Sequence, residues 1–169
     1  MTKQVRHNKN KFMKRHSALI PLSHDHHHGL LLAQLLKRNA PEYHGLPKDL
    51  LGKMNFAKEM FHKELEHHFR DEEELVFLYL KSKDVELDNL ISEILNEHII
   101  LKEKILSLNE NPNLVDQLDE IGNILSEHIR KEERVLFEKA QMLLSNDELK
   151  IIENKFDESR PGNKSYKTK

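Results

Sequence analysis

The sequence predicts an all-α fold, an antiparallel up-down-up-down four-helix bundle with a short fifth helix at the C-terminus. Three observations support this prediction. Of the 169 residues only five are Gly and five are Pro, and the chain is rich in the helix formers Leu, Glu and Lys. Four segments repeat apolar residues at a period of about 3.6. Short loops separate these segments, and a short loop makes successive helices antiparallel neighbours.

The first two helices are expected on either side of a loop that contains Pro41 and Gly45. Ser23 is the expected N-cap of the first helix, which continues through a Leu-rich stretch to residue 39. The second helix is expected to begin near Pro47 and to end at Leu80, a length of about thirty-five residues by its apolar period.

The third and fourth helices are expected at residues 87–108 and 112–143. A polar turn at residues 81–84 precedes the third helix. Asn111 followed by Pro112 is typical of an N-cap with Pro at the first helical position. These boundaries complete two helical hairpins, one in each half of the chain.

Ser145 and Glu148 form the pattern of a capping box, which predicts a short fifth helix ending near Phe156. The bundle is expected to span residues 16–158. Residues 1–15, with six basic and no acidic side chains, are predicted to be a flexible arm. Residues 159–169 are predicted to be a disordered basic tail.

Composition excludes several classes of function. The chain has no Cys, so thiolate metal sites, disulfides and Cys nucleophiles are excluded. No apolar run has the length of a secretory signal or a membrane span, so we expect a cytoplasmic protein without a membrane partner. The residues between the two basic ends carry 17 basic and 29 acidic side chains, so no nucleic-acid partner is expected. Twelve His residues, mostly grouped, require another explanation.

A repeat with an offset of sixty residues carries many of these His residues. Residues 65–77 and 125–137 share Leu, His, Arg, Glu, Glu and Phe at six of thirteen positions. Each copy follows a predicted helix with His on an apolar face, the cluster of residues 24–28 in the first half and His98 in the second. Each predicted hairpin therefore contributes one lone His and one His-x-x-x-Glu pair.

The spacing of these pairs predicts a metal site. Residues i and i+4 lie one turn apart on the same helix face, so His68 with Glu72, and His128 with Glu132, can each present an imidazole and a carboxylate to one interior point. A buried His or Glu without a partner is costly. Two metal ions bridged by the carboxylates would satisfy all of these groups.

This arrangement resembles the hemerythrin-like, or HHE, cation-binding family over nearly the whole body, from about residue 16 to residue 156. The matching features are the run Leu22-Ser23-His24-Asp25-His26-His27 and both His-x-x-x-Glu-Glu helices. The resemblance implies a di-iron centre whose ligands are His26, His68, Glu72, His98, His128 and Glu132.

The chain departs from the family's oxygen carriers at two positions. Those proteins also place His-x-x-x-His on the third helix and His-x-x-x-x-Asp on the fourth. Here Lys102 stands four residues after His98, and Glu follows His128 at both the fourth and the fifth position. The departure argues against reversible oxygen carriage.

Several ligand assignments have alternatives. Leu22, His26, Gly29 and Ala33 share one stripe of the first helix, which favours His26, and His27 is the second choice because it projects about 100° further round. Glu64 is either an additional ligand or a hydrogen-bond partner of a ligand. Glu73 and Glu133 are expected beside the ligands rather than among them. The remaining His residues near the site are expected to be solvated, although one could replace the missing ligand at Lys102: His24, His28, His62 and His67.

The resemblance implies a non-haem di-iron protein that binds or senses dioxygen, nitric oxide or peroxide, or that handles iron. An alternative is a di-iron enzyme that disproportionates peroxide or reduces nitric oxide at the same centre, and a third is a structural or metal-storage bundle. Zinc and manganese are possible substitutes, since His and carboxylate also suit them. The expected partner is a small diatomic ligand or peroxide, and the chain is expected to be a monomer or a weak homo-oligomer.

Overall fold

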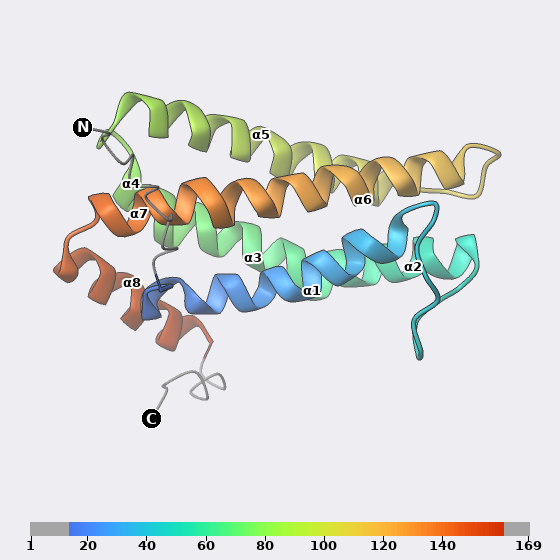
Figure 1. Cartoon of the computed structure of the whole chain (residues 1–169), viewed down its shortest axis with the longest axis horizontal. Coiled ribbons are helices and arrows are strands. Elements are labelled where there is room, and N and C mark those ends of the chain that lie inside the picture. The colour runs from blue at the N-terminus through green and yellow to red at the C-terminus, as the bar shows by residue number, and fades with distance from the viewer. Residues whose placement is uncertain (1–13, 161–169) are drawn as a thin grey trace, which may run out of the picture.

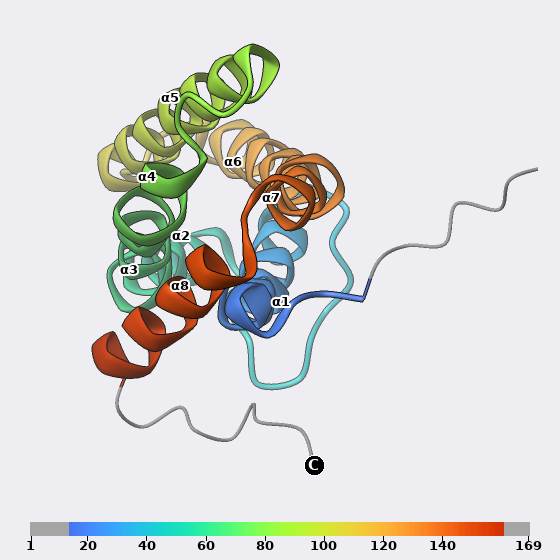
Figure 2. The same cartoon turned by 90° about the vertical axis from the view of Figure 1, so that its left-hand side faces the viewer.

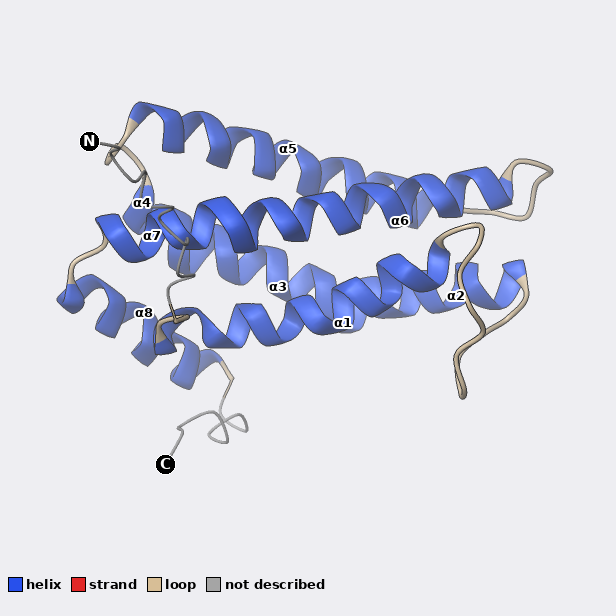
Figure 3. Cartoon of the chain, viewed as in Figure 1, coloured by secondary structure: helices blue, strands red, loops and turns tan. Residues whose placement is uncertain are grey.

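A computed structural model describes residues 14–160 and confirms the all-α fold and the antiparallel four-helix bundle. Every regular element within these residues is a helix (Figure 3). Four helical rods run alternately in opposite directions, and α8 (Asn146–Ser159) lies across one end of the bundle (Figures 1 and 2). No helix in the described range combines the length and the apolar character that a membrane crossing needs.

The rods consist of these elements. The first is η1 (Ser17–Leu19) and α1 (Ile20–Leu36). The second is α2 (Leu50–Met60), η2 (Phe61–Leu65), α3 (Glu66–Asp71), η3 (Glu72–Val76) and α4 (Phe77–Leu80). The third is α5 (Val85–Ser107). The fourth is α6 (Leu114–Lys131), η4 (Glu132–Leu136) and α7 (Phe137–Leu143), and α8 (Asn146–Ser159) follows.

Three short π-helical segments, η2, η3 and η4, interrupt the second and fourth rods. In a π-helix the backbone hydrogen bond spans five residues, which adds one residue to the turn. The two segments η3 and η4 begin at Glu72 and Glu132, the equivalent positions of the repeat. The wider turns therefore occur in both halves at the predicted metal-binding carboxylates.

Two predicted helix starts were wrong. Ser23 lies inside α1, which begins at Ile20; Pro21 lies in the first turn, where the missing N–H leaves no helical hydrogen bond unmade. Asn111 does not cap the fourth rod, because α6 begins only at Leu114 and the Asn111 side chain accepts a hydrogen bond from the backbone N–H of Asn113. In both cases a polar residue near the start of a helix was predicted as the N-cap, but the helix begins at another residue.

Other helix boundaries lie close to their predicted positions. The second rod begins at Leu50 rather than near Pro47, because the Asp49 carboxylate caps it by accepting from the Gly52 backbone N–H. The predicted capping box of the fifth helix is confirmed, with Ser145 and Glu148 each accepting a backbone hydrogen bond from the other residue.

Two hydrophobic clusters fill the bundle and leave a polar layer between them. The first cluster lies at the end covered by α8 and includes Phe77, Phe137 and Phe156. The second lies at the opposite end and includes Phe61 and Leu118. Along each rod, buried His or Glu side chains separate the residues of one cluster from those of the other.

The predicted arm and tail fall mostly outside the described residues, which exclude 1–13 and 161–169. At the boundaries the structure differs from the prediction. Arg15 donates to a Glu133 carboxylate oxygen at 2.7 Å, so the N-terminal end of the described chain contacts the fourth rod. Ser159 belongs to α8, and Arg160 is ion-paired with Asp25 and Asp71, so neither is part of a disordered tail.

Candidate metal centre

The structure brings all six predicted ligand residues together in the polar layer, and none of them is more than 4% exposed. They come from all four rods. The first and third rods each contribute one His, from α1 and α5. The second and fourth rods each contribute a His and a Glu one turn apart. The set is His26, His68, Glu72, His98, His128 and Glu132.

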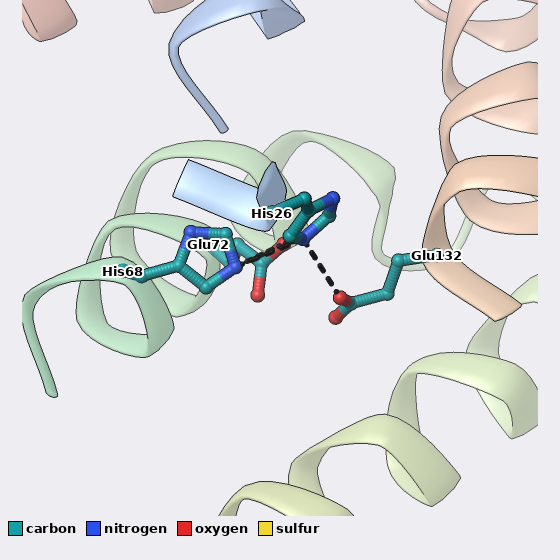
Figure 4. A group of neighbouring side chains, drawn as sticks. All are labelled: His26, His68, Glu72 and Glu132. Carbon is teal, nitrogen blue, oxygen red and sulfur yellow. Dashed lines mark hydrogen bonds and ion pairs between the residues drawn. The ribbon is translucent and has the colours of Figure 1, made fainter. Parts of the chain in front are cut away.

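One half of the centre consists of His26, His68, Glu72 and Glu132, whose nearest ligand atoms all lie within 4.8 Å of one another (Figure 4). His26 Nε2 is 3.0 Å from His68 Nε2 and 3.1 Å from Glu132 Oε2. His68 Nε2 is 3.5 Å from Glu72 Oε1. In Figure 4 the two imidazole rings point toward each other beside the two carboxylates.

The other half consists of Glu72, His98, His128 and Glu132, within the same limit of 4.8 Å. His98 Nε2 is 3.4 Å from Glu72 Oε2, and His128 Nε2 is 3.3 Å from Glu132 Oε1. Both carboxylates thus belong to both halves, and each turns one oxygen toward one half and the second oxygen toward the other. This is the geometry that two carboxylates bridging a pair of metal ions require.

The outward-facing nitrogen of each imidazole has a carboxylate partner. His26 Nδ1 donates to Glu133 at 2.7 Å and His98 Nδ1 donates to Glu73 at 2.7 Å, so these two Glu residues lie beside the ligands as predicted. His68 Nδ1 is 3.2 Å from Asp25 and His128 Nδ1 is 2.8 Å from Glu97. A carboxylate in this place fixes the tautomer and the orientation of a metal-binding imidazole.

Sequence reasoning missed Asp25 and Glu97. Each residue immediately precedes the lone His of its hairpin, His26 or His98, and each contacts the His of the paired rod instead. The shared acidic residue before the lone His was a signal available in the sequence. This shared acidic residue extends the internal symmetry of the centre to residues outside the repeat at 65–77 and 125–137.

The inner atoms of the centre lack hydrogen-bond partners. Because the carboxylates only accept, each Nδ1 donates to its carboxylate, and Nε2 is the nitrogen that faces the interior of the centre. Among the described residues, both oxygens of Glu72, both oxygens of Glu132, and Nε2 of His98 and His128 are buried without a hydrogen bond. Burying so many acceptors without a partner is strongly unfavourable. Divalent cations between them would satisfy these atoms, so the residues fit a two-metal centre.

The electrostatics also favour cations in the centre. Burial disfavours the charged form of His26 and His98, but the facing carboxylates outweigh it and raise the pKa to about 10 for His26 and about 11 for His98. Burial likewise opposes the charged form of Glu132, yet the surrounding imidazoles hold its pKa well below the usual value. The negative charge that raises these pKa values equally attracts metal cations.

The alternative ligands lie away from the centre. His27 and His67 are exposed, and the structure places His26 rather than His27 against the other rings. Glu64 contacts His28 at 3.4 Å and His62 contacts Glu66 at 3.4 Å, both at the surface. His24 is exposed as well. Lys102 is 56% exposed and points to Glu66, so within the described residues nothing replaces a second His on the third rod.

Comparison with known proteins identifies the family. The chain matches the family model described as the hemerythrin HHE cation binding domain over residues 17–140. Neither curated proteins nor solved structures gave a match. The matched range covers most of the chain and contains all six residues of the centre, so the chain belongs to the hemerythrin HHE cation-binding domain family.

Proposed function

We propose that this chain is a non-haem di-iron protein that binds or senses a small ligand, dioxygen, nitric oxide or peroxide, or that handles iron. The observation that carries the proposal is the pair of buried carboxylates that belong to two His-containing groups and have no hydrogen-bond partner of their own. A purely structural bundle would reach the same packing with apolar residues. The proposed ligands are His26, His68, Glu72, His98, His128 and Glu132.

The donor set is compatible with iron, and the choice of iron among the metals it suits follows from the family. Imidazole nitrogen and carboxylate oxygen suit iron, manganese and zinc, and the chain offers no thiolate. When bound, two iron ions supply redox chemistry toward small oxygen- or nitrogen-containing ligands. The protein supplies an orienting carboxylate for every imidazole and two hydrophobic clusters that keep water from either side of the centre.

A surface pocket lies beside the second half of the centre. Its volume is about 380 Å³, and His98 is part of its lining. Phe69 also lines this pocket and stacks on the His98 ring, with centroids 4.0 Å apart. Each half offers four side chains, fewer than the six ligands of an octahedral ion, which leaves positions for a small ligand on each ion. The full lining is Phe61, Glu66, Phe69, Arg70, Glu73, His98, Ile99 and Lys102.

The pocket is equally consistent with the second candidate, an enzyme that disproportionates peroxide or reduces nitric oxide. Turnover needs both an open ligand position and a route by which substrate and product exchange, and the pocket beside His98 lies where such a route would begin. The two candidates use the same residues and differ in reactivity.

Metal analysis followed by ligand addition tests the proposal. The full chain is purified without oxygen, reconstituted with ferrous iron, and its iron content is measured. We expect about two iron ions per chain, because both carboxylates serve both groups. Absorption spectra are then recorded after adding dioxygen, nitric oxide or hydrogen peroxide, and continued consumption of peroxide or nitric oxide would favour the enzyme. One iron ion or fewer, with no gain in thermal stability, would contradict the proposal.

A further inference from the structure

The two halves of the centre are related by an internal symmetry, and one of the places where it fails is the cation beside an orienting carboxylate. In the second half, Glu97 orients His128, and the Lys131 side chain is ion-paired with Glu97. In the first half, Asp25 orients His68 in the same way. The residue sixty positions before Lys131 is Asp71, an acidic residue where the second half has a basic one.

Arg160 compensates for this difference. Its Nη1 lies 2.9 Å from Asp25 Oδ2, and its Nε lies 2.8 Å from Asp71 Oδ2. One guanidinium thus joins the carboxylate that orients His68 to the carboxylate that stands in the place of Lys131. Asp71 is 6% exposed, and a buried carboxylate of this kind requires a cation.

Arg160 comes from a different part of the fold than Lys131. It follows the last residue of α8, the helix that lies across the end of the bundle (Figure 2). The match to the family covers residues 17–140, so α8 and Arg160 both lie beyond it. The first half of the centre therefore takes its outer cation from outside the four rods.

We propose that Arg160 is a positioning residue of the metal centre, which takes in the first half the role that Lys131 has in the second. Arg160 holds Asp25 in place, Asp25 orients the His68 ring, and α8 thereby controls how firmly one of the two metal ions is held. The inference rests on the proposed function, because it concerns the retention of the metal.

A pair of double variants isolates the charge at position 71. Removing Arg160 alone would leave Asp71 buried and unpaired, so both residues are changed together. Asp71→Gln/Arg160→Gln removes the cation and the buried charge. Asp71→Lys/Arg160→Gln places a cation beside Asp25, as Lys131 lies beside Glu97. Arg38→Gln is the control, since Arg38 pairs with Asp116 at the surface and does not contact the centre.

The experiment measures how fast ferrozine removes iron from each full-length protein loaded with ferrous iron under anaerobic conditions. We expect one of the two ions to leave the Asp71→Gln/Arg160→Gln protein at least about tenfold faster than it leaves the wild type, the usual size of an effect on an orienting residue. The Asp71→Lys/Arg160→Gln protein and the Arg38→Gln control should release iron at nearly the wild-type rate. Recovery by Lys distinguishes positioning from a general loss of packing.

The outcomes separate this inference from the proposed function. The iron content of the wild type before ferrozine is added tests the function, and a chain that takes up no iron overturns both. If the wild type holds two ions but the two double variants release them at equal rates, only the inference is overturned. Faster release of both ions in equal measure also overturns it, because Arg160 contacts one half alone.

Discussion

The shared carboxylates lead to a prediction about how many ions each substitution removes. Glu132 belongs to both groups of the centre, whereas His68 belongs to one. Glu132→Gln keeps the shape of the side chain and removes its charge, so it should weaken both ions. His68→Ala should weaken one. His67→Ala and Glu127→Gln are the matched controls, since both residues are exposed neighbours on the same rods.

The size of the effect follows from binding linkage. At a free metal concentration about 100 times the dissociation constant, one ion bound only by the folded chain stabilises it by about 2.7 kcal/mol. For a domain of this size, about 1 kcal/mol shifts Tm by roughly 2–4 °C. Two ions should therefore raise the wild-type Tm by roughly 10–20 °C, and one ion by about half of that. The metal-induced shift should be nearly lost in Glu132→Gln and about halved in His68→Ala.

The assay is thermal unfolding of each variant with and without ferrous iron under anaerobic conditions, together with measurement of bound iron. Comparing each variant with its own metal-free form removes the effect of the substitution on the fold itself. If ferrous iron raises the Tm of Glu132→Gln as much as it raises the Tm of the wild type, the assignment of this residue to both groups is refuted. If ferrous iron no longer raises the Tm of His67→Ala, the placement of the ligands on the inward face of the rod is refuted.

Three further predictions concern the choice of His, the protons of the centre and its reactivity. His26→Ala should remove more iron than His27→Ala, measured as iron per chain, because only His26 is buried against the other rings; the reverse order would place the ligand on the other face of α1. In the metal-free chain, the raised pKa values of about 10 for His26 and about 11 for His98 contribute stability that is present in full below the unfolded value of about 6.5 and is lost as the pH rises through 10 to 11. Zinc binding at pH 8 should accordingly release about two protons per chain, measured with a pH indicator in weak buffer, and no release would contradict these pKa values. The ferrous protein should be oxidised by dioxygen without a long-lived oxygen adduct, because Lys102 points away from the centre and supplies no third imidazole; a stopped-flow absorbance change that reverses when dioxygen is removed would contradict this.

The sequence alone determined the four rods and the six residues of the centre. An apolar period near 3.6 and short loops are local properties, so they predict helices and their antiparallel order without knowledge of packing. The His-x-x-x-Glu pairs are local as well, because residues four apart share a helix face in any helix. The repeat then identified the two pairs as equivalent, and the lone His of each hairpin completed the set.

The tertiary structure decided the partners of these residues. Glu133 lies 107 positions from His26, and Arg160 lies 89 positions from Asp71, so their contacts depend on how the rods and α8 pack and not on any spacing in the chain. The π-helical segments at Glu72 and Glu132 were also not predicted, because an apolar period near 3.6 predicts a continuous α-helix through both positions. Helix spacing determines which side chains share a face, but only packing determines which residues that face contacts, and so Asp25, Glu97 and the cations beside them became evident only in the structure.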